Sequence, residues 1–407
     1  MIEHNDNCIT VGHDTLGWTA HHDAGSFGGR FSMELANDRL CEDGGFYVDD
    51  MTVAHAVVDH ANAYRKSGTA VVESRAHLPF GNGVELAQAC RYAANHVSVT
   101  LDIQWRRGVS VNRHLGVNAM WLPGRWSRYY CLPPAVQWAD GIEPAWHELP
   151  EVNEGETMAG HWHRPPLCLV FERPDGKCLE IGTGSDLWRW EQCLGAGPDK
   201  GSYKIQVQPD GIRLIWEPLM CCEPYDPPPR QYRMKWYMAW DNGEAPRPPA
   251  PAGKSRTVEM GADRKLKIPE QGEAGQYWVL DMTRLQWPET AYRTGSAPAY
   301  IRGERSSLPC AEGNATRKLL KRVVRQLADR AEPGILEWRG LTLGPCWDSS
   351  HVNRKNRDGT VHWDISTMLE FGTWARRQLG PAWDIRVAND LANVLPSLAG
   401  LFQPTAF

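Results

Sequence analysis

The chain has 407 residues, of which 42% are hydrophobic and 23% are charged, and its formal net charge is −5. This apolar content is enough for a hydrophobic core and is not typical of a disordered chain. The length predicts one large domain with an appendage, or two domains, and the acidic balance does not indicate a surface for nucleic acid.

The chain begins with a polar, acidic stretch, Met1–Asn7, which lacks the basic and apolar regions of a signal peptide. No segment approaches the ~18 consecutive apolar residues that a membrane span requires. The eleven cysteines are odd in number and lack C-x-x-C spacing, which favours reduced thiols over a disulfide framework. We therefore expect a cytoplasmic protein without a membrane partner.

The first part of the chain predicts short strands and then a helix. Residues 1–50 are rich in Gly and His and indicate strands and loops. A helix is predicted from Asp50 to Gly68. Its apolar residues recur at helical spacing: Val53, Val57, Ala61 and Tyr64.

The clearest strand signals follow. Apolar and polar residues alternate with period two in Gly83–Ala94 and His96–Trp105, with a turn at 93–95, and again in Val109–Trp121. The stretch 132–165, rich in Pro and Glu, predicts a long excursion over the sheet. Two hairpins around Pro-Asp-Gly turns and one more strand complete the set: Leu167–Glu172 with Cys178–Gly182, Tyr203–Gln208 with Ile212–Trp216, and Tyr232–Trp240.

Residues 243–256 form a Pro-rich segment that predicts a linker or an exposed loop. Beyond it the sequence predicts one strand over 276–281 and three helices. The helices are expected over 315–331, from a capping box at Thr367–Glu370 to Gly380, and over 389–401.

Together these elements predict a mainly β fold. We expect a large antiparallel β-sandwich, similar to a supersandwich, over residues 1–242. A smaller mixed section over 257–407 is expected to pack three helices on this sandwich.

Tryptophan is the compositional outlier, with 19 residues. A flat apolar ring with one N–H donor matches the C–H face of a sugar, so Trp residues in loops or beside polar residues suggest a carbohydrate surface. The candidates are Trp126, Trp162, Trp188, Trp190, Trp236, Trp240, Trp347 and Trp363. The alternative is that these rings fill a wide sheet core, and we expect about half to do so.

The paired-strand stretch Gly83–Trp126, together with the hairpins over 167–182 and 203–216, resembles the long strands of galactose-mutarotase-like β-supersandwich domains. This resemblance implies sugar handling, because the group includes mutarotases, polysaccharide lyases and domains of glycoside hydrolases. Its mutarotases pair histidines with a late glutamate. Their His-containing motif with a following Asn is not found here, so the resemblance assigns no catalytic residue.

Acid–base chemistry on a sugar needs a proton donor and an acceptor, commonly a His–carboxylate pair. Glu217 follows the predicted strand Ile212–Trp216, and His114 follows another strand near the expected mouth of the sheet. His163 belongs to a cluster with alternate histidines. We predict His163 or His114 as the acid or base and Glu217 as its carboxylate partner.

Three clusters are predicted to bind substrate. Two histidines at alternate positions of a strand share one face, and the other clusters are loops that combine charged groups with Trp. The residues are His161 and Arg164; Asp186, Trp188 and Trp190; and Asp348, His351, Arg354 and Trp363. The alternative for each cluster is a solvated loop with ordinary packing.

No standard fingerprint of a cofactor or metal site is found, so neither is expected. A Ser349–His351–Asp364 triad is formally available but lacks the Gly-x-Ser-x-Gly elbow. The basic helix over 317–330 is better explained as a solvated amphipathic face than as a nucleic-acid contact.

Three hypotheses follow. The sequence favours a carbohydrate-active enzyme, that is, a glycoside hydrolase, polysaccharide lyase or sugar isomerase with a His–carboxylate pair in a Trp-lined cleft. The alternative is a non-catalytic carbohydrate-binding or accessory protein on the same scaffold. A third is a structural protein whose Trp rings are all in the core. The expected partner is a monosaccharide or oligosaccharide, not nucleic acid, and an oligomer is compatible with the sequence.

Overall fold

The computed structural model describes residues 1–5, 7–24, 30–43, 45–49, 51–52, 57–66, 68–78, 84–116, 118–132, 144–162, 166–183, 199–221, 223–241, 256–257, 259–260, 266–267, 277–281, 290–293, 304–309, 314–330, 333–339, 344–346, 361–363, 365–388 and 395–397. The contacts of the chain divide it into two compact units. Unit 1 comprises Met1–Pro134, Glu143–Glu244 and Ala406–Phe407, and unit 2 comprises Ala135–Ile142 and Ala245–Thr405.

Unit 1 contains a twelve-stranded antiparallel sheet with the order β1-β2-β3-β4-β5-β13-β20-β12-β6-β7, in which β19 pairs with both β20 and β16. A short 3-10 helix over Asp14–Leu16 joins β2 to β3. The strands are β1 Ile2–Asn5, β2 Cys8–His13, β3 Trp18–Asp23, β4 Phe31–Leu35, β5 Asp38–Asp43, β6 Tyr47–Val48, β7 Met51–Thr52, β12 His114–Gly116, β13 Asn118–Pro123, β16 Thr157–Trp162, β19 Asp199–Gln208 and β20 Gly211–Met220.

A nine-stranded antiparallel sheet forms the other layer, with the order β15-β14-β17-β18-β21-β11-β10-β9-β8. Its strands are β8 Val57–Lys66, β9 Thr69–Leu78, β10 Val84–Ala93, β11 His96–Trp105, β14 Arg128–Leu132, β15 Ala145–Glu148, β17 Cys168–Glu172, β18 Cys178–Thr183 and β21 Gln231–Asp241. The two predicted Pro-Asp-Gly hairpins are confirmed as β17–β18 and β19–β20.

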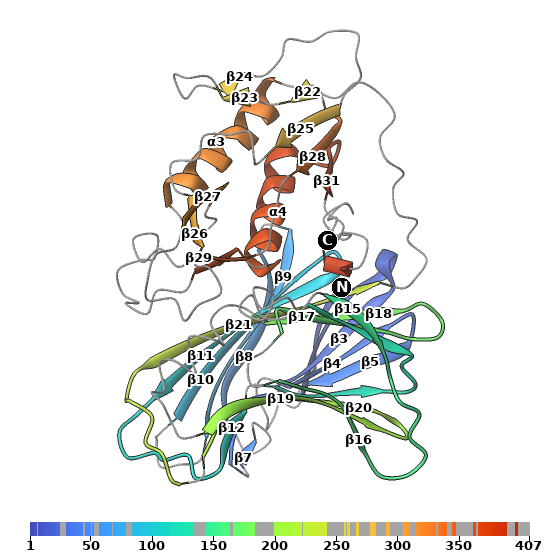
Figure 1. Cartoon of the computed structure of the whole chain (residues 1–407), viewed down its shortest axis with the longest axis vertical. Coiled ribbons are helices and arrows are strands. Elements are labelled where there is room, and N and C mark those ends of the chain that lie inside the picture. Colours follow the sequence, from blue (N-terminus) through green and yellow to red (C-terminus); the bar gives the residue numbers. More distant parts are fainter. Residues whose placement is uncertain are drawn as a thin grey trace. The chain divides into compact units, whose positions relative to one another are not determined.

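The two sheets pack face to face around one core (Figure 1). Alternate residues of each strand point inward. Phe31 of β4 stacks on Trp236 of β21 at 6.0 Å between ring centroids. The sulfur atoms of Cys41 on β5 and Met238 on β21 lie 3.9 Å apart. The mainly β, sandwich-like architecture predicted from the sequence is therefore confirmed.

The predicted helix from Asp50 to Gly68 is wrong. Its described residues form strands β7 and β8, and β8 pairs with β9 from Val57 to Lys66. Gly68, with a φ of 74°, lies in the turn of this hairpin and does not end a helix. The long strand pairing outweighs a helical spacing of apolar residues that was carried largely by Val. The expected excursion over 132–165 also contains two strands, β15 and β16.

Unit 2 contains a parallel four-stranded sheet that the sequence did not predict, with the order β22-β25-β28-β31. Two helices connect its last three strands: α3 and α4. Trp338 of β28 packs on Phe371 of α4 at 5.3 Å between ring centroids. The elements are β22 Arg256–Thr257, β25 Tyr277–Asp281, α3 Asn314–Arg330, β28 Ile335–Arg339, α4 Ile365–Leu379 and β31 Asp384–Ala388, with the two-stranded pairs β23 Glu259–Met260 and β24 Leu266–Lys267, β26 Thr290–Arg293 and β27 Glu304–Pro309, and β29 Gly344–Cys346 and β30 Val361–Trp363.

The helices of unit 2 match the sequence only in part. Helix α3 lies where the apolar stripe predicted it. Helix α4 begins at Ile365, so the Thr367–Glu370 capping box lies inside it, while Gly380 ends it as expected with a φ of 86°. The predicted helix over 389–401 falls mostly outside the described residues. In the described part of the chain, no helix is long and apolar enough to cross a membrane.

Candidate functional site

Glu217 lies on β20 at a point where the alternation of the strand changes. Ile212, Leu214 and Trp216 belong to the core before it, and Leu219 belongs to the core after it. Glu217 is 8% exposed. A carboxylate in this position keeps a path to solvent while its surroundings are largely dry.

His114 lies beside Glu217. Strand β12 pairs with the end of β20 through His114 and Met220 and through Leu115 and Leu219, which brings His114 close to Glu217. The distance from His114 Nδ1 to Glu217 Oε1 is 3.9 Å. This is too long for a direct hydrogen bond and short enough for a substrate oxygen or a water to bridge the two groups.

Tyr47 of β6 completes the group. Its hydroxyl donates a 2.9 Å hydrogen bond to Glu217 Oε1, and its ring meets the His114 ring edge to face, with centroids 5.4 Å apart. Burial raises the pKa of Tyr47, and the neighbouring Glu217 carboxylate adds to this, against an opposing effect of Arg213. Tyr47 is therefore a fixed hydrogen-bond donor, which leaves Glu217 Oε2 as the free acceptor of the carboxylate.

Asp49 fixes the position of His114. Its carboxylate accepts hydrogen bonds from the backbone N–H groups of Asn112, Arg113 and His114, at 2.7–3.2 Å. Burial alone would raise the pKa of Asp49, but these hydrogen bonds outweigh it and hold the pKa below its usual value. The residue adopts a left-handed backbone with a φ of 51°, a conformation that Asp tolerates better than most residues.

The carbonyl oxygen of Asp49 also lies 3.0 Å from His114 Nε2. A carbonyl oxygen can only accept, so Nε2 carries the proton and donates it. Nδ1 of a neutral His114 is then an acceptor, and it is the nitrogen that faces Glu217. His114 Nδ1 and Glu217 Oε1 are therefore two neighbouring atoms of the kinds that general acid–base chemistry uses.

The candidate residues from the sequence are placed unevenly. Most of them lie outside the described residues: His163, Arg164, Asp186, Trp188, Trp190, Asp348, His351 and Arg354. The backbone of Trp363 belongs to β30, but its side chain is not among those described. His161 is exposed on β16 and pairs with Lys204, which pairs in turn with Ile215. It therefore lies two strands away from β20, or about 10 Å.

Two members of the group, Tyr47 and Asp49, were missed by the sequence reasoning. Both lie within residues 1–50, for which the sequence predicted short strands and loops. The signal that was available is local: a Tyr and an Asp separated by one residue, the Tyr on the short strand β6 and the Asp just after it. Only the pairing of β6 with β12 brings them to a residue 65 positions later in the chain.

The expected Trp-lined cleft is not found in the described part of the chain. Most Trp side chains with a described exposure are buried, including Trp126, Trp236 and Trp240, which were candidates for sugar contact. Trp162 is half-buried and packs against the core. The reason is the width of the sandwich, which needs large side chains to fill it. Beside His114 the described aromatic ring is that of Tyr47.

The donor set gives no indication of a metal site. Among the residues that the structure describes, no group of three or more His, Cys, Asp and Glu side chains is arranged to hold a metal ion. The His114 imidazole and the two carboxylates near it are each bound by protein donors or acceptors.

No protein-family model matches the sequence, and no curated protein matches it significantly. Several solved structures are similar to the chain. One is a protein from Synechocystis sp. PCC 6803, with 9% identity and a TM-score of 0.41, over 59% of this chain and 97% of that chain. Another is a candidate aldose 1-epimerase from Escherichia coli, with 12% identity and a TM-score of 0.35, over 57% and 98%.

A third is an alpha-N-acetylgalactosaminidase from Bifidobacterium bifidum, with 11% identity and a TM-score of 0.36, over 91% of this chain and 57% of that chain. Two of these three structures are named for an activity on carbohydrates, one as an epimerase and one as a glycosidase. Similarity at this level carries no argument about the reaction, which has to be argued from the site.

Proposed function

We propose that unit 1 is a catalytic domain for a carbohydrate, in which His114 and Glu217 exchange protons with two neighbouring oxygens of one sugar ring. The observation that carries this proposal is the 3.9 Å separation of His114 Nδ1 and Glu217 Oε1. The reaction type that fits best is the interconversion of aldose anomers.

The separation argues against hydrolysis of a glycosidic bond. The two catalytic carboxyl groups of glycosidases stand about 5–5.5 Å apart in retaining enzymes and about 6.5–9.5 Å apart in inverting enzymes, because they act on opposite sides of the scissile bond. Among the described residues, the other carboxylate near this pair is that of Asp49, which is occupied by backbone N–H groups. In anomer interconversion, by contrast, both reacting oxygens are attached to the same carbon, so the acid and the base have to be neighbours.

The reaction balances with these two groups. Glu217 takes the proton of the anomeric hydroxyl while protonated His114 gives its Nδ1 proton to the ring oxygen. The bond between the anomeric carbon and the ring oxygen breaks, and the open-chain aldehyde forms. After rotation of the aldehyde, the ring closes by the reverse proton transfers, and both side chains return to their starting states.

Three assays on the full-length protein distinguish the reaction types. Polarimetry on freshly dissolved glucose and galactose detects anomer interconversion, ultraviolet absorbance detects the unsaturated product of a lyase, and a reducing-end assay detects hydrolysis. We expect activity in the first assay, reduced about 10²–10⁴-fold in Glu217→Gln. Sugar binding without activity in any assay would instead support the non-catalytic alternative.

A further inference from the structure

A pocket lies at one end of the sandwich of unit 1, away from Glu217. It encloses about 350 Å³, within the lower range of small-ligand sites. It is formed by the start of β5, the turn after β13 and the turn between β17 and β18. Its lining residues are Asp38, Arg39, Pro123, Gly124, Arg125, Arg173, Pro174 and Asp175.

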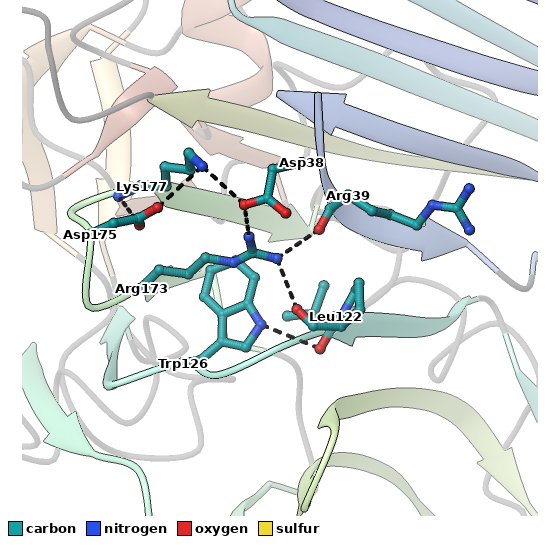
Figure 2. A network of polar contacts seen from close by, with 8 residues as sticks. Asp38, Arg39, Leu122, Trp126, Arg173, Asp175 and Lys177 are labelled. Atoms are coloured by element: carbon teal, nitrogen blue, oxygen red, sulfur yellow. Dashed lines mark hydrogen bonds and ion pairs between the residues drawn. The ribbon is translucent and has the colours of Figure 1, made fainter. Parts of the chain in front are cut away.

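Arg173 forms a rigid wall of this pocket. Its side chain is 8% exposed and donates to Asp38 Oδ2 at 2.6 Å, to the Arg39 carbonyl at 2.6 Å and to the Pro123 carbonyl at 2.8 Å. Its guanidinium lies 4.7 Å from the centre of the Trp126 ring. Figure 2 shows Asp38 and the backbone of Arg39, both of β5, in contact with this guanidinium group. A wall held this firmly is preorganised for a ligand.

The two aspartates of the pocket pair with Arg173 and Lys177 and not with the other two arginines of the lining. Asp38 is paired with Arg173 and with Lys177 at 2.9 Å, and Asp175 is paired with Lys177 at 3.1 Å (Figure 2). Arg39 and Arg125 are the remaining cations of the lining, with side chains 50% and 74% exposed.

The present partners of these two arginines are exposed glutamates: Glu34 and Glu42 for Arg39, and Glu151 for Arg125. Such surface pairs contribute little and exchange easily. An arginine fork matches a carboxylate geometrically, so an anionic group of a ligand can replace these glutamates.

Asp38 adds a second requirement. Both of its described hydrogen bonds involve Oδ2, so Oδ1, on a half-exposed side chain, remains an acceptor without a partner. It would repel an oxygen of a bare inorganic anion but would accept a hydrogen bond from a hydroxyl group. We propose that this pocket binds a sugar acid, with the carboxylate on Arg39 and Arg125 and a hydroxyl on Asp38. The choice of a sugar, though not that of an anion, rests on the function proposed above.

The pocket is separate from the His114–Glu217 group. The Gly124 N–H bonds to the Asp210 carbonyl, in the turn that precedes β20. Glu217 lies six residues beyond the first residue of β20, which corresponds to about 20 Å. A single sugar ring cannot reach both places, so the pocket would hold a different residue of an oligosaccharide or a separate ligand.

The test is calorimetric titration of the full-length protein with glucuronate, glucose and inorganic sulfate. The test variant is Arg39→Gln/Arg125→Gln. The matched control is Arg106→Gln/Arg233→Gln, which removes two exposed arginines that also pair with carboxylates, Glu85 and Asp102. We expect glucuronate to bind the wild type, the control and Glu217→Gln alike, and to bind the test variant at least 10-fold more weakly.

Unchanged glucuronate binding in the test variant would overturn the proposal. So would loss of binding only in Glu217→Gln, because that result would place the ligand in the other site. Sulfate binding as tightly as glucuronate would show a simple anion site and overturn the assignment of a sugar acid. None of these binding measurements depends on anomer interconversion. A failure of the proposed sugar-acid site can therefore be distinguished from a failure of the proposed catalytic function.

Discussion

Tyr47 and Gly116 face each other across β6 and β12, and the ring of Tyr47 occupies the place of a side chain at position 116. A Cβ built at Gly116 would lie 2.0 Å from two carbon atoms of that ring. The absent side chain lets the ring cross the middle strand and reach Glu217 on β20. The glycine therefore sets the geometry of the candidate site without contacting a substrate.

The first prediction concerns this glycine. Gly116→Ala should displace the Tyr47 ring, break its hydrogen bond to Glu217 and lower the free energy of unfolding by about 1–3 kcal/mol. In a Tyr47→Ala background the ring is gone, so the same substitution should cost much less. Chemical denaturation of the two single variants and the double variant measures this coupling. Additive effects would contradict the packing described here.

Asp49→Asn tests the element that holds His114. Asparagine tolerates the left-handed backbone, but the backbone N–H groups lose a charged acceptor, so we expect a loss of about 1.5–3 kcal/mol at pH 7. Because the folded-state pKa of Asp49 lies below its usual value, its stabilisation is present above pH 3.8 and is lost as the pH falls through the folded-state pKa. The difference between wild type and variant should therefore shrink in acid.

Denaturation curves between pH 3 and pH 7 measure this difference. Glu154→Gln, which changes an exposed carboxylate without a described hydrogen bond, serves as the control and should show no such trend. A gap between wild type and Asp49→Asn that stays constant down to pH 3 would refute the role of the charged carboxylate.

Arg173→Ala tests the link between the two sheets. The substitution removes three hydrogen bonds and the stacking on Trp126. We expect a loss of about 2–3 kcal/mol, less than the ~3–5 kcal/mol of a fully buried pair, because Asp38 is half exposed and retains Lys177. Arg233→Ala, which breaks an exposed pair with Asp102, should cost less than about 1 kcal/mol. Equal losses in the two variants would argue against a link that depends on burial.

His22 should stay neutral in the folded protein. It is 4% exposed and hydrogen-bonds to the Tyr92 hydroxyl at 2.6 Å. Burial, with a smaller effect of His21, lowers its pKa to about 3. The unfolded chain binds a proton at this site near pH 6.5, so the stability that His22 provides is present above pH 6.5 and declines towards pH 3.

The NMR signals of the His22 ring should therefore not shift between pH 5 and pH 8. The stability gap between wild type and His22→Gln should narrow as the pH falls over this range, whereas exposed His4, changed to Gln, should show no such narrowing. A His22 ring that titrates near pH 6.5 would show that it is open to solvent.

The sequence predicted the sheets of unit 1 well, because strict alternation in His96–Trp105 and the Pro-Asp-Gly turns specify strand and register locally. It placed His114 and Glu217 among the catalytic candidates, and the structure brings these two together, although their role remains a proposal. The rest depended on pairings between distant segments. Nothing near Tyr47 indicates that Gly116 will lie beside it.

Two errors have the same physical origin. The helical spacing of Val53 and Val57 is compatible with a strand, and only the partner strand β9 decides between them. Trp236 and Trp240 are examples of tryptophans that stand beside polar residues. They are four positions apart on strand β21, so they share one face of the sheet, and both indoles point into the core. In both cases the local pattern leaves the structure open, and the pairing of the strand within its sheet decides it.

The central claim is that His114 and Glu217 act together on one sugar. Exchange NMR on an equilibrated aldose measures the rate of anomer interconversion directly in the wild type, His114→Ala, Glu217→Gln and the double variant. If the two side chains work as a unit, each single variant should lose nearly all of the rate that the double variant loses. Independent, additive losses, or a wild type no faster than buffer, would contradict the account.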